Sequence, residues 1–220
     1  MSYVLMKVLE SAPSRYDRGI NLITLGRINK AYDRLASRIK DRWNVLDIGC
    51  GTGAMTLRAA QHGAHVVGID VNPQMLEIAN RRRQEMGLLN NVELRQQGVA
   101  ELSSEPTAQY HAVTSALVFS ELTEDERVYT LQQLRRLLKP GGLLLVADET
   151  RPSGFLKGLL YWLLRIPLMI VTYVLTQTST RAVKNLPKMV SKAGFIVEEI
   201  HSSWLGDLTE LVCKNPVIRE

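Results

Sequence analysis

The stretch that organises this chain is VLDIGCGTG, residues 45–53. It predicts a short apolar strand that runs into a loop with glycine at every second position, and the helix-forming run AMTLRAA follows at once. Glycine lets the backbone turn sharply and approach a ligand that a Cβ would block, and the first N–H groups of the helix point toward whatever is bound. Strand, glycine loop and helix together indicate a nucleotide-type site.

Strands and helices alternate regularly around this stretch. Strands are expected at 45–48, 65–70, 92–95, 112–119, 143–147, 196–200 and 208–214. Helices are expected at 54–62, from Pro73 to near Gly87, at 124–138 with Val128 on the apolar face, and at 179–193, and a turn is expected at 139–142. This alternation predicts an α/β fold, Rossmann-like and doubly wound, with a mostly parallel seven-stranded sheet covered by helices on both faces.

The length and composition favour a single domain over residues 1–220. A chain of 220 residues that is 45% hydrophobic can bury one good-sized core. We expect a helical preface at 1–42, a cofactor-binding core at 43–150, an apolar helical lid at 151–178, and a closing helix with strands at 179–215.

Net charge, cysteine content and the first residues of the chain bear on its partners, its metal content and its compartment. The net charge of +5 permits a nucleic acid or an anionic membrane without requiring either. No aromatic residues interleave with the arginine triplet 81–83, so we expect a solvated face and no nucleic-acid partner. Cys50 and Cys213 cannot form a disulfide framework, and no Cys/His spacing indicates a metal site. Residues 1–10 lack the apolar core of a signal peptide, which favours the cytoplasm.

The predicted lid is the most informative region for the substrate. Residues 158–176 are apolar apart from Arg165 and approach the length of a bilayer span. A spanning helix is disfavoured because Pro167 and Arg165 interrupt the run and it lies between elements of one sheet. A lid packed on the sheet is preferred; the alternatives are an apolar acceptor tunnel and, through residues 155–175, peripheral docking on a membrane or a partner.

Two nucleotide classes share a glycine loop followed by an acid about 20 residues later. In dinucleotide-binding domains that acid binds a ribose hydroxyl, and Asp70 fills the position here. The spacing G-x-G-x-G of residues 49–53 departs, however, from the G-x-G-x-x-G of those domains. Asp47, two residues before the first glycine, also suits a cationic ligand better than a diphosphate. An NAD-dependent dehydrogenase is therefore disfavoured.

Three ordered motifs resemble those of the class I S-adenosylmethionine-dependent methyltransferases. They are VLDIGCGTG at 45–53, VGID with NPQML within 67–76, and LLKPGG at 137–142. The resemblance covers about Arg42 to Glu149 and is closest to the quinone-biosynthesis C-methyltransferase branch. The segments 117–122, 147–149 and 175–178 look more particularly like methyltransferases associated with corrinoid proteins.

The resemblance implies a set of cofactor-binding residues. They are Asp47, Gly49, Cys50, Gly51, Gly53, Asp70, Val71, Met75, Val99, Ala100 and Leu117. The glycine loop would lie against the methionine part of S-adenosylmethionine, and Asp70 would accept hydrogen bonds from both ribose hydroxyls. Val99 departs from the family pattern, because many relatives carry an acid there for the adenine amino group. The backbone of Val99 or Ala100, or the Glu101 side chain, would then make that contact.

Candidate catalytic residues follow the fourth strand, where the acceptor faces the site in such folds. Ser120 and Glu121 occupy that place, and Glu121 is a candidate general base or alternatively a helix cap. Cys50 is better explained as a small residue in a tight turn than as a reactive thiol.

The sequence thus predicts a methyltransferase that uses S-adenosylmethionine, releases S-adenosylhomocysteine and needs no metal. The acceptor would be small or lipophilic, and methyl transfer would be an in-line displacement that requires alignment and exclusion of water. The alternative is a non-catalytic S-adenosylmethionine-binding or partner-docking module, for example one that serves a corrinoid protein.

Overall fold

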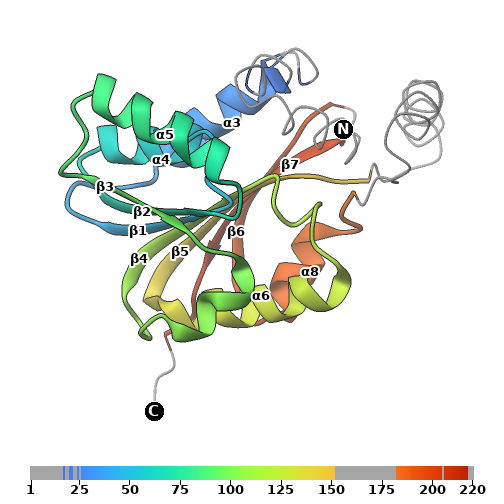
Figure 1. Cartoon of the computed structure of the whole chain (residues 1–220). Helices are drawn as coiled ribbons and strands as arrows, with labels where there is room; N and C mark the ends of the chain where they lie inside the picture. The colour runs from blue at the N-terminus through green and yellow to red at the C-terminus, as the bar shows by residue number, and fades with distance from the viewer. Residues whose placement is uncertain are drawn as a thin grey trace.

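The sheet of this protein has seven strands and is doubly wound, as the sequence predicts. The computed structural model describes residues 17, 20–21, 24, 26–151, 182–204 and 206–217. The strands are β1 (Asn44–Ile48), β2 (His65–Asp70), β3 (Val92–Gln96), β4 (Tyr110–Ala116), β5 (Leu138–Glu149), β6 (Ile196–Ser202) and β7 (Leu208–Lys214). Their order is β3-β2-β1-β4-β5-β7-β6, with β7 antiparallel to both of its neighbours (Figure 1). The predicted fold class is confirmed.

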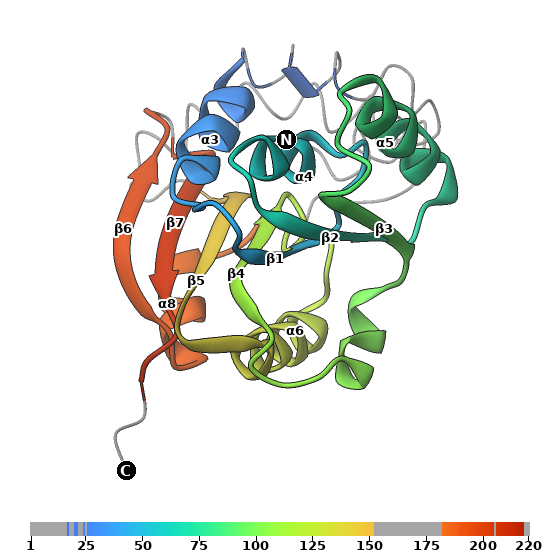
Figure 2. The ribbon, with the colours of Figure 1, turned by 90° about the vertical axis from the view of Figure 1, so that its left-hand side faces the viewer.

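Helices cover both faces of this sheet. α3 (Arg27–Ala36), α4 (Ala54–Gln61) and α5 (Pro73–Glu85) lie on one face. The other face carries the 3-10 helix η1 (Val99–Ser104), α6 (Glu124–Leu137) and α8 (Leu186–Lys192) (Figures 1 and 2). Each face has its own apolar core: Ile28 and Leu57 belong to the first, and Leu134 and Leu186 to the second. Burial on both faces explains the near-continuous apolar runs of the central strands.

Two ion pairs attach α3 to the C-terminal hairpin. Arg27 Nη1 lies 2.9 Å from Asp207 Oδ1, just before β7. Arg34 donates through Nε and Nη2 to the two oxygens of Glu210, at 2.9 and 2.6 Å. A paired guanidinium and carboxylate of this kind fix orientation as well as distance. The helix that precedes the sheet in sequence is therefore held by its last strand.

Several local expectations were wrong. The predicted helix at 179–193 begins only at Leu186, where the Asn185 side chain caps it by accepting from the Lys188 N–H. The predicted strand 112–119 already ends at Ala116, because Leu117 takes a left-handed backbone conformation with φ +62°. The predicted turn at 139–142 lies inside β5, where pairing with β4 shifts register between Tyr110 and Ala112. Val128 is 53% exposed, because the buried face of α6 runs through Arg127, Thr130 and Leu134 instead.

The predicted lid at 151–178 lies outside the described residues apart from Arg151. Within the described residues, no helix has the length and hydropathy needed to cross a bilayer.

Candidate active site

The glycine loop after β1 adopts a conformation that side chains rarely tolerate. Gly49, Gly51 and Gly53 have φ of +61°, +52° and +83°. A Cβ on Gly49 would lie 2.4 Å from Cγ2 of Val118, whereas a Cβ on Gly51 would have no atom within 4 Å. The loop is thus closed against the protein at Gly49 and open at Gly51, where the backbone can meet a ligand.

Asp70, the last residue of β2, is oriented by two backbone N–H groups. Oδ2 accepts from the Gly51 N–H and Oδ1 from the Asn72 N–H, both at 2.8 Å. Asn72 in turn caps α5, because its side-chain oxygen accepts from the Gln74 N–H at 3.0 Å. The carboxylate is therefore fixed between the glycine loop and the start of α5.

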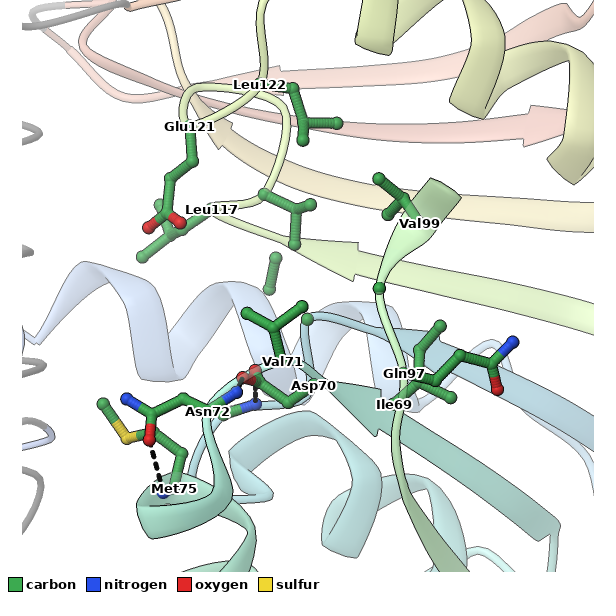
Figure 3. A pocket seen from close by; sticks show the side chains of 15 residues that line it. Ile69, Asp70, Val71, Asn72, Met75, Gln97, Val99, Leu117, Glu121 and Leu122 are labelled. Atoms are coloured by element: carbon green, nitrogen blue, oxygen red, sulfur yellow. Dashed lines mark hydrogen bonds between the residues drawn. The ribbon is translucent and has the colours of Figure 1, made fainter. Parts of the chain in front are cut away.

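A cavity of about 160 Å³ opens beside Asp70. It is lined by Gly49, Gly51, Ile69, Asp70, Val71, Asn72, Met75, Gln97, Gly98, Val99, Ala116, Leu117, Val118, Glu121 and Leu122. Figure 3 shows Leu117 and Glu121, from the segment after β4, facing Asp70 and Val71 across this space. These residues gather at the carboxyl ends of parallel strands, where open α/β sheets bind ligands. The wall is largely apolar, with a fixed carboxylate at one side.

A second cavity, of about 500 Å³, lies beyond the glycine loop. It is bordered by Tyr32 of α3 together with Asp47 and Cys50, and it shares Gly49, Gly51 and Ala116 with the first cavity. The glycine loop thus borders two adjoining cavities. An elongated ligand that touches the loop would reach into both.

Asp47, in the strand that leads into the loop, connects β1 to α4 and β4. Its carboxylate is buried and accepts from the hydroxyls of Thr56 and Thr114, each at 2.6 Å. Burial raises the pKa of Asp47 to about 6, against the lowering effect of the two hydroxyls. Burial also raises the pKa of the Cys50 thiol well above its usual value, so the reactive thiolate is disfavoured.

Asp17 braces the outer side of the loop and was not among the predicted site residues. One oxygen accepts from the Thr52 hydroxyl at 2.7 Å, and the other lies 2.5 Å from Nη2 of Arg82. Arg82 also donates to the Thr52 carbonyl at 3.2 Å. The preface, the loop and α5 are therefore joined at Thr52. A single acid within a helical preface carries no sequence signal for this role.

The segment after β4 is held by a buried acid of β5. Asp148 accepts from the N–H groups of Phe119, Ser120 and Glu149 at 2.7, 3.2 and 2.7 Å. Burial raises its pKa to about 6. The Ser120 hydroxyl donates to the Leu117 carbonyl at 3.2 Å and does not line the cavity, whereas Glu121 does. Of the two candidate catalytic residues, Glu121 is the one with access to a ligand.

Glu101 and Ala100, in the segment after β3, do not line the cavity, contrary to expectation. The Glu101 carboxylate accepts from the Gly98 N–H at 3.1 Å and so caps η1 rather than reaching the cavity. The Ala100 carbonyl accepts from the Tyr129 hydroxyl at 3.0 Å, and Ala100 does not line the cavity. Val99 does line it and presents an apolar surface.

Most of the predicted cofactor residues come together. Gly49, Gly51, Asp70, Val71, Met75, Val99 and Leu117 line the first cavity, and Asp47 and Cys50 line the second. Gly53 lines neither cavity and is instead the N-cap residue of α4. Gln97 and Val118 were missed, because neither residue type marks a ligand contact by itself. Among the described residues, no group of three or more His, Cys, Asp or Glu side chains is placed to hold a metal ion.

Residues 45–142 match the family model described as "Methyltransferase domain". This part of the chain is similar to methyltransferase domains of the class that uses S-adenosylmethionine. The match sets aside the dinucleotide alternative, and the cofactor that the family implies is S-adenosylmethionine.

Curated proteins similar to this chain are methyltransferases. A ubiquinone/menaquinone biosynthesis C-methyltransferase from Proteus mirabilis is 30% identical over 151 residues, which cover 66% of this chain and 59% of that protein. A ubiquinone biosynthesis O-methyltransferase from Xanthomonas oryzae is 29% identical, over 65% of this chain and 56% of that protein. The chain therefore spans less than two thirds of the length of these relatives.

The fold of this chain also has solved counterparts. The structure described as a putative methyltransferase from Bacillus halodurans superposes with a TM-score of 0.68 at 18% identity, over 84% of this chain and 99% of that one. At this identity the likeness concerns the fold alone.

Proposed function

We propose that this protein transfers a methyl group from S-adenosylmethionine to a small or lipophilic acceptor by in-line displacement. The observation that carries the proposal is the pair of cavities that meet at the glycine loop, with the oriented Asp70 carboxylate in one and the buried Asp47 in the other. The family match over residues 45–142 supports methyl transfer as the reaction at these cavities.

The residues present fit the cofactor. The open face at Gly51 allows close approach to the backbone, Asp70 offers an acceptor for ribose hydroxyls, and Val71, Val99 and Leu117 offer apolar walls for a base. Asp47 would place negative charge near a cationic ligand beyond the loop. When bound, S-adenosylmethionine supplies an electrophilic methyl carbon on a positively charged sulfur.

The role of the chain is then to align the acceptor, keep water out and accept a proton where the acceptor has one. Leu117 and Leu122 provide apolar surface beside the cavity, and apolar walls exclude water. Glu121 is the carboxylate that enters the cavity from the acceptor side, and we assign it the role of general base for a hydroxyl acceptor. Ser120 and Asp148 position the segment that carries it.

We also propose a quinone-type ring as the acceptor class. The support is that the two relatives named above are a C- and an O-methyltransferase of ubiquinone biosynthesis, and that the cavity wall is apolar on the side of Leu117 and Leu122. A corrinoid protein as partner and peripheral membrane contact through residues 155–175 stay predictions from the sequence.

The first test is binding of S-adenosylhomocysteine, which is measured by thermal shift and by calorimetry. We expect it to raise the Tm of the wild type and Asp70→Ala to weaken its affinity by about 10- to 100-fold, as expected for lost charged hydrogen bonds. Asp125→Ala, which removes an exposed acid from the first turn of α6, is the matched control and should keep the affinity. No shift of the wild type at saturating ligand would refute the proposal.

The second test separates an enzyme from a binding module. One feature favours the module: Val99 stands where the family resemblance implies an acid, and Glu101 is engaged by the Gly98 N–H. Labelled S-adenosylmethionine with a panel of phenolic and quinol acceptors should give turnover that falls about 100-fold or more in Glu121→Gln. A cofactor that binds without turnover on any acceptor would favour the module.

A further inference from the structure

A groove of about 610 Å³ runs between α6 and α8, on the sheet face opposite α3. Its charged lining residues are Arg127, Arg151, Lys184, Lys188, Lys192 and Glu124. They come from the N-terminal half of α6, from the residue after β5, and from α8 with the segment before it. We call this feature the basic groove.

The charge of the basic groove is strongly one-sided. Five cationic side chains face one carboxylate, a net charge of +4, beside +5 for the whole chain. Arg151, Lys184, Lys188 and Lys192 are exposed, and none makes an ion pair with another described residue. Like charges held close together repel one another, so this arrangement favours a bound anion.

One cation of the basic groove is fixed in place. Arg127 is only 8% exposed, and its Nε donates to the Phe119 carbonyl at 2.6 Å. Phe119 belongs to the segment after β4 that Asp148 holds. The guanidinium thus connects the wall of the groove to the backbone that carries Glu121.

The groove is apolar as well as charged. Leu122, Val128 and Met189 line it between the cations, and Val128 remains 53% exposed. Leu122 also lines the cavity beside Asp70, so the two hollows meet at this side chain. A ligand with an anionic end and an apolar body would match both features at once.

We propose that the basic groove is the anion subsite of the methyl acceptor. It binds a phosphate or carboxylate group of the acceptor, whose apolar part extends past Leu122 toward the methyl donor. The inference rests on the proposed methyltransferase function and adds to it that the acceptor is an anionic amphiphile. It also gives Lys184, Lys188 and Lys192 a role in acceptor selection.

The test uses 1-naphthyl phosphate, 1-naphthol and inorganic phosphate as probes in calorimetric titrations of the whole chain. We expect the phosphate ester to bind at least about tenfold more tightly than either other probe, because only it fills the charged and the apolar parts. Lys188→Glu should weaken its affinity by about tenfold or more, since one charged contact is lost and a repulsive charge is added.

Two matched controls make the result specific. Arg81→Glu makes the same charge change at an exposed position of α5, on the other face of the sheet, and should alter the affinity by less than about twofold at physiological salt. Leu122→Ala should abolish the advantage of the ester over inorganic phosphate, whereas Leu89→Ala, at an exposed leucine away from the groove, should not. Equal losses in Lys188→Glu and Arg81→Glu would overturn the proposal.

A third arm distinguishes the source of the anion. Vesicles of phosphatidylglycerol and phosphatidylcholine are sedimented with the wild type and with Lys188→Glu. Vesicle binding that depends on Lys188, combined with no binding of the phosphate ester, would show a lipid surface and overturn the acceptor subsite. Because S-adenosylhomocysteine binding is measured on the same variants, failure of the groove and failure of the proposed function give different results.

Discussion

The loops after β1 and after β4 line the same cavity, and both turn the chain through a left-handed backbone conformation. The first does so with three glycines, and the second with Leu117 at φ +62°. Each is braced by a buried aspartate whose pKa burial raises to about 6. Asp47 holds its surroundings through two hydroxyls, whereas Asp148 holds three backbone N–H groups directly.

The two loops differ in how the conformational free energy of a left-handed turn is offset. Glycine adopts positive φ at little cost, so the loop after β1 needs its aspartate mainly for placement. A leucine in the same conformation costs of the order of 1–2 kcal/mol, which the surrounding structure has to offset. The three hydrogen bonds to Asp148 provide that stabilisation and set the position of Glu121.

The largest effect should come from removing that support. Asp148→Ala leaves the buried N–H groups of Phe119, Ser120 and Glu149 without their acceptor, and we expect a loss of about 3–5 kcal/mol in the free energy of unfolding. Asp47→Ala should cost less, because the hydroxyls of Thr56 and Thr114 can rotate to other acceptors. Urea unfolding measures both, and equal losses would contradict this contrast.

The second effect separates the closed from the open side of the glycine loop. Gly49→Ala combines positive φ with a contact against Val118, so we expect a loss of about 3 kcal/mol in stability. Gly51→Ala adds a Cβ to open space and should cost only about 1 kcal/mol while weakening S-adenosylhomocysteine about tenfold or more. Similar losses of stability for the two variants would show that the loop is not divided in this way.

The third effect is a dependence of stability on pH. Unfolded Asp47 and Asp148 release their protons near the usual pKa of 3.8, whereas the folded protein retains them until about pH 6. The contribution of each group to the free energy of unfolding is therefore fully present below about pH 4 and is lost as the pH rises to about 6, by about 3 kcal/mol for each group. Asp47→Asn should remove its share of the decline in a pH series of urea unfolding curves. An unchanged slope in this variant would rule out Asp47 as a source.

The smallest effect is a difference in stability between the glycine and alanine variants of Leu117, which should be opposite in sign to that at an ordinary helical position. Because φ is positive there, Leu117→Gly should be about 1 kcal/mol more stable than Leu117→Ala. At Leu131, buried within α6, the order should be the opposite, because glycine is the poorer helix former by about 1 kcal/mol. The same order at both positions, measured by chemical denaturation, would argue against the left-handed turn.

The sequence predicted the half of the site that glycine and capping chemistry encode. The G-x-G-x-G loop, Asp70 at the end of β2 and the Asn72-Pro73 start of α5 all lie where local rules placed them. These residue types have few uses at such positions, so their pattern is informative. The strand β2 and the terminal strand β7 were also predicted with the correct bounds.

The other half depends on contacts that are distant in sequence. Nothing about a leucine indicates positive φ, so the end of β4 was placed too late. The cations at 127, 151 and 184–192 look like separate solvated positions until α6 and α8 pack side by side. Arg127 lies on the buried face of α6, where Val128 was expected, and Val128 lines the groove instead.

The ion pairs between α3 and the C-terminal hairpin have a consequence for the order of assembly. Tyr32 of α3 forms part of the wall of the second cavity, but its helix is secured by Asp207 and Glu210. During synthesis the glycine loop and its neighbouring strands leave the ribosome long before those acids do. The ion pairs that secure this wall of the second cavity can therefore form only after Asp207 and Glu210 have been synthesised.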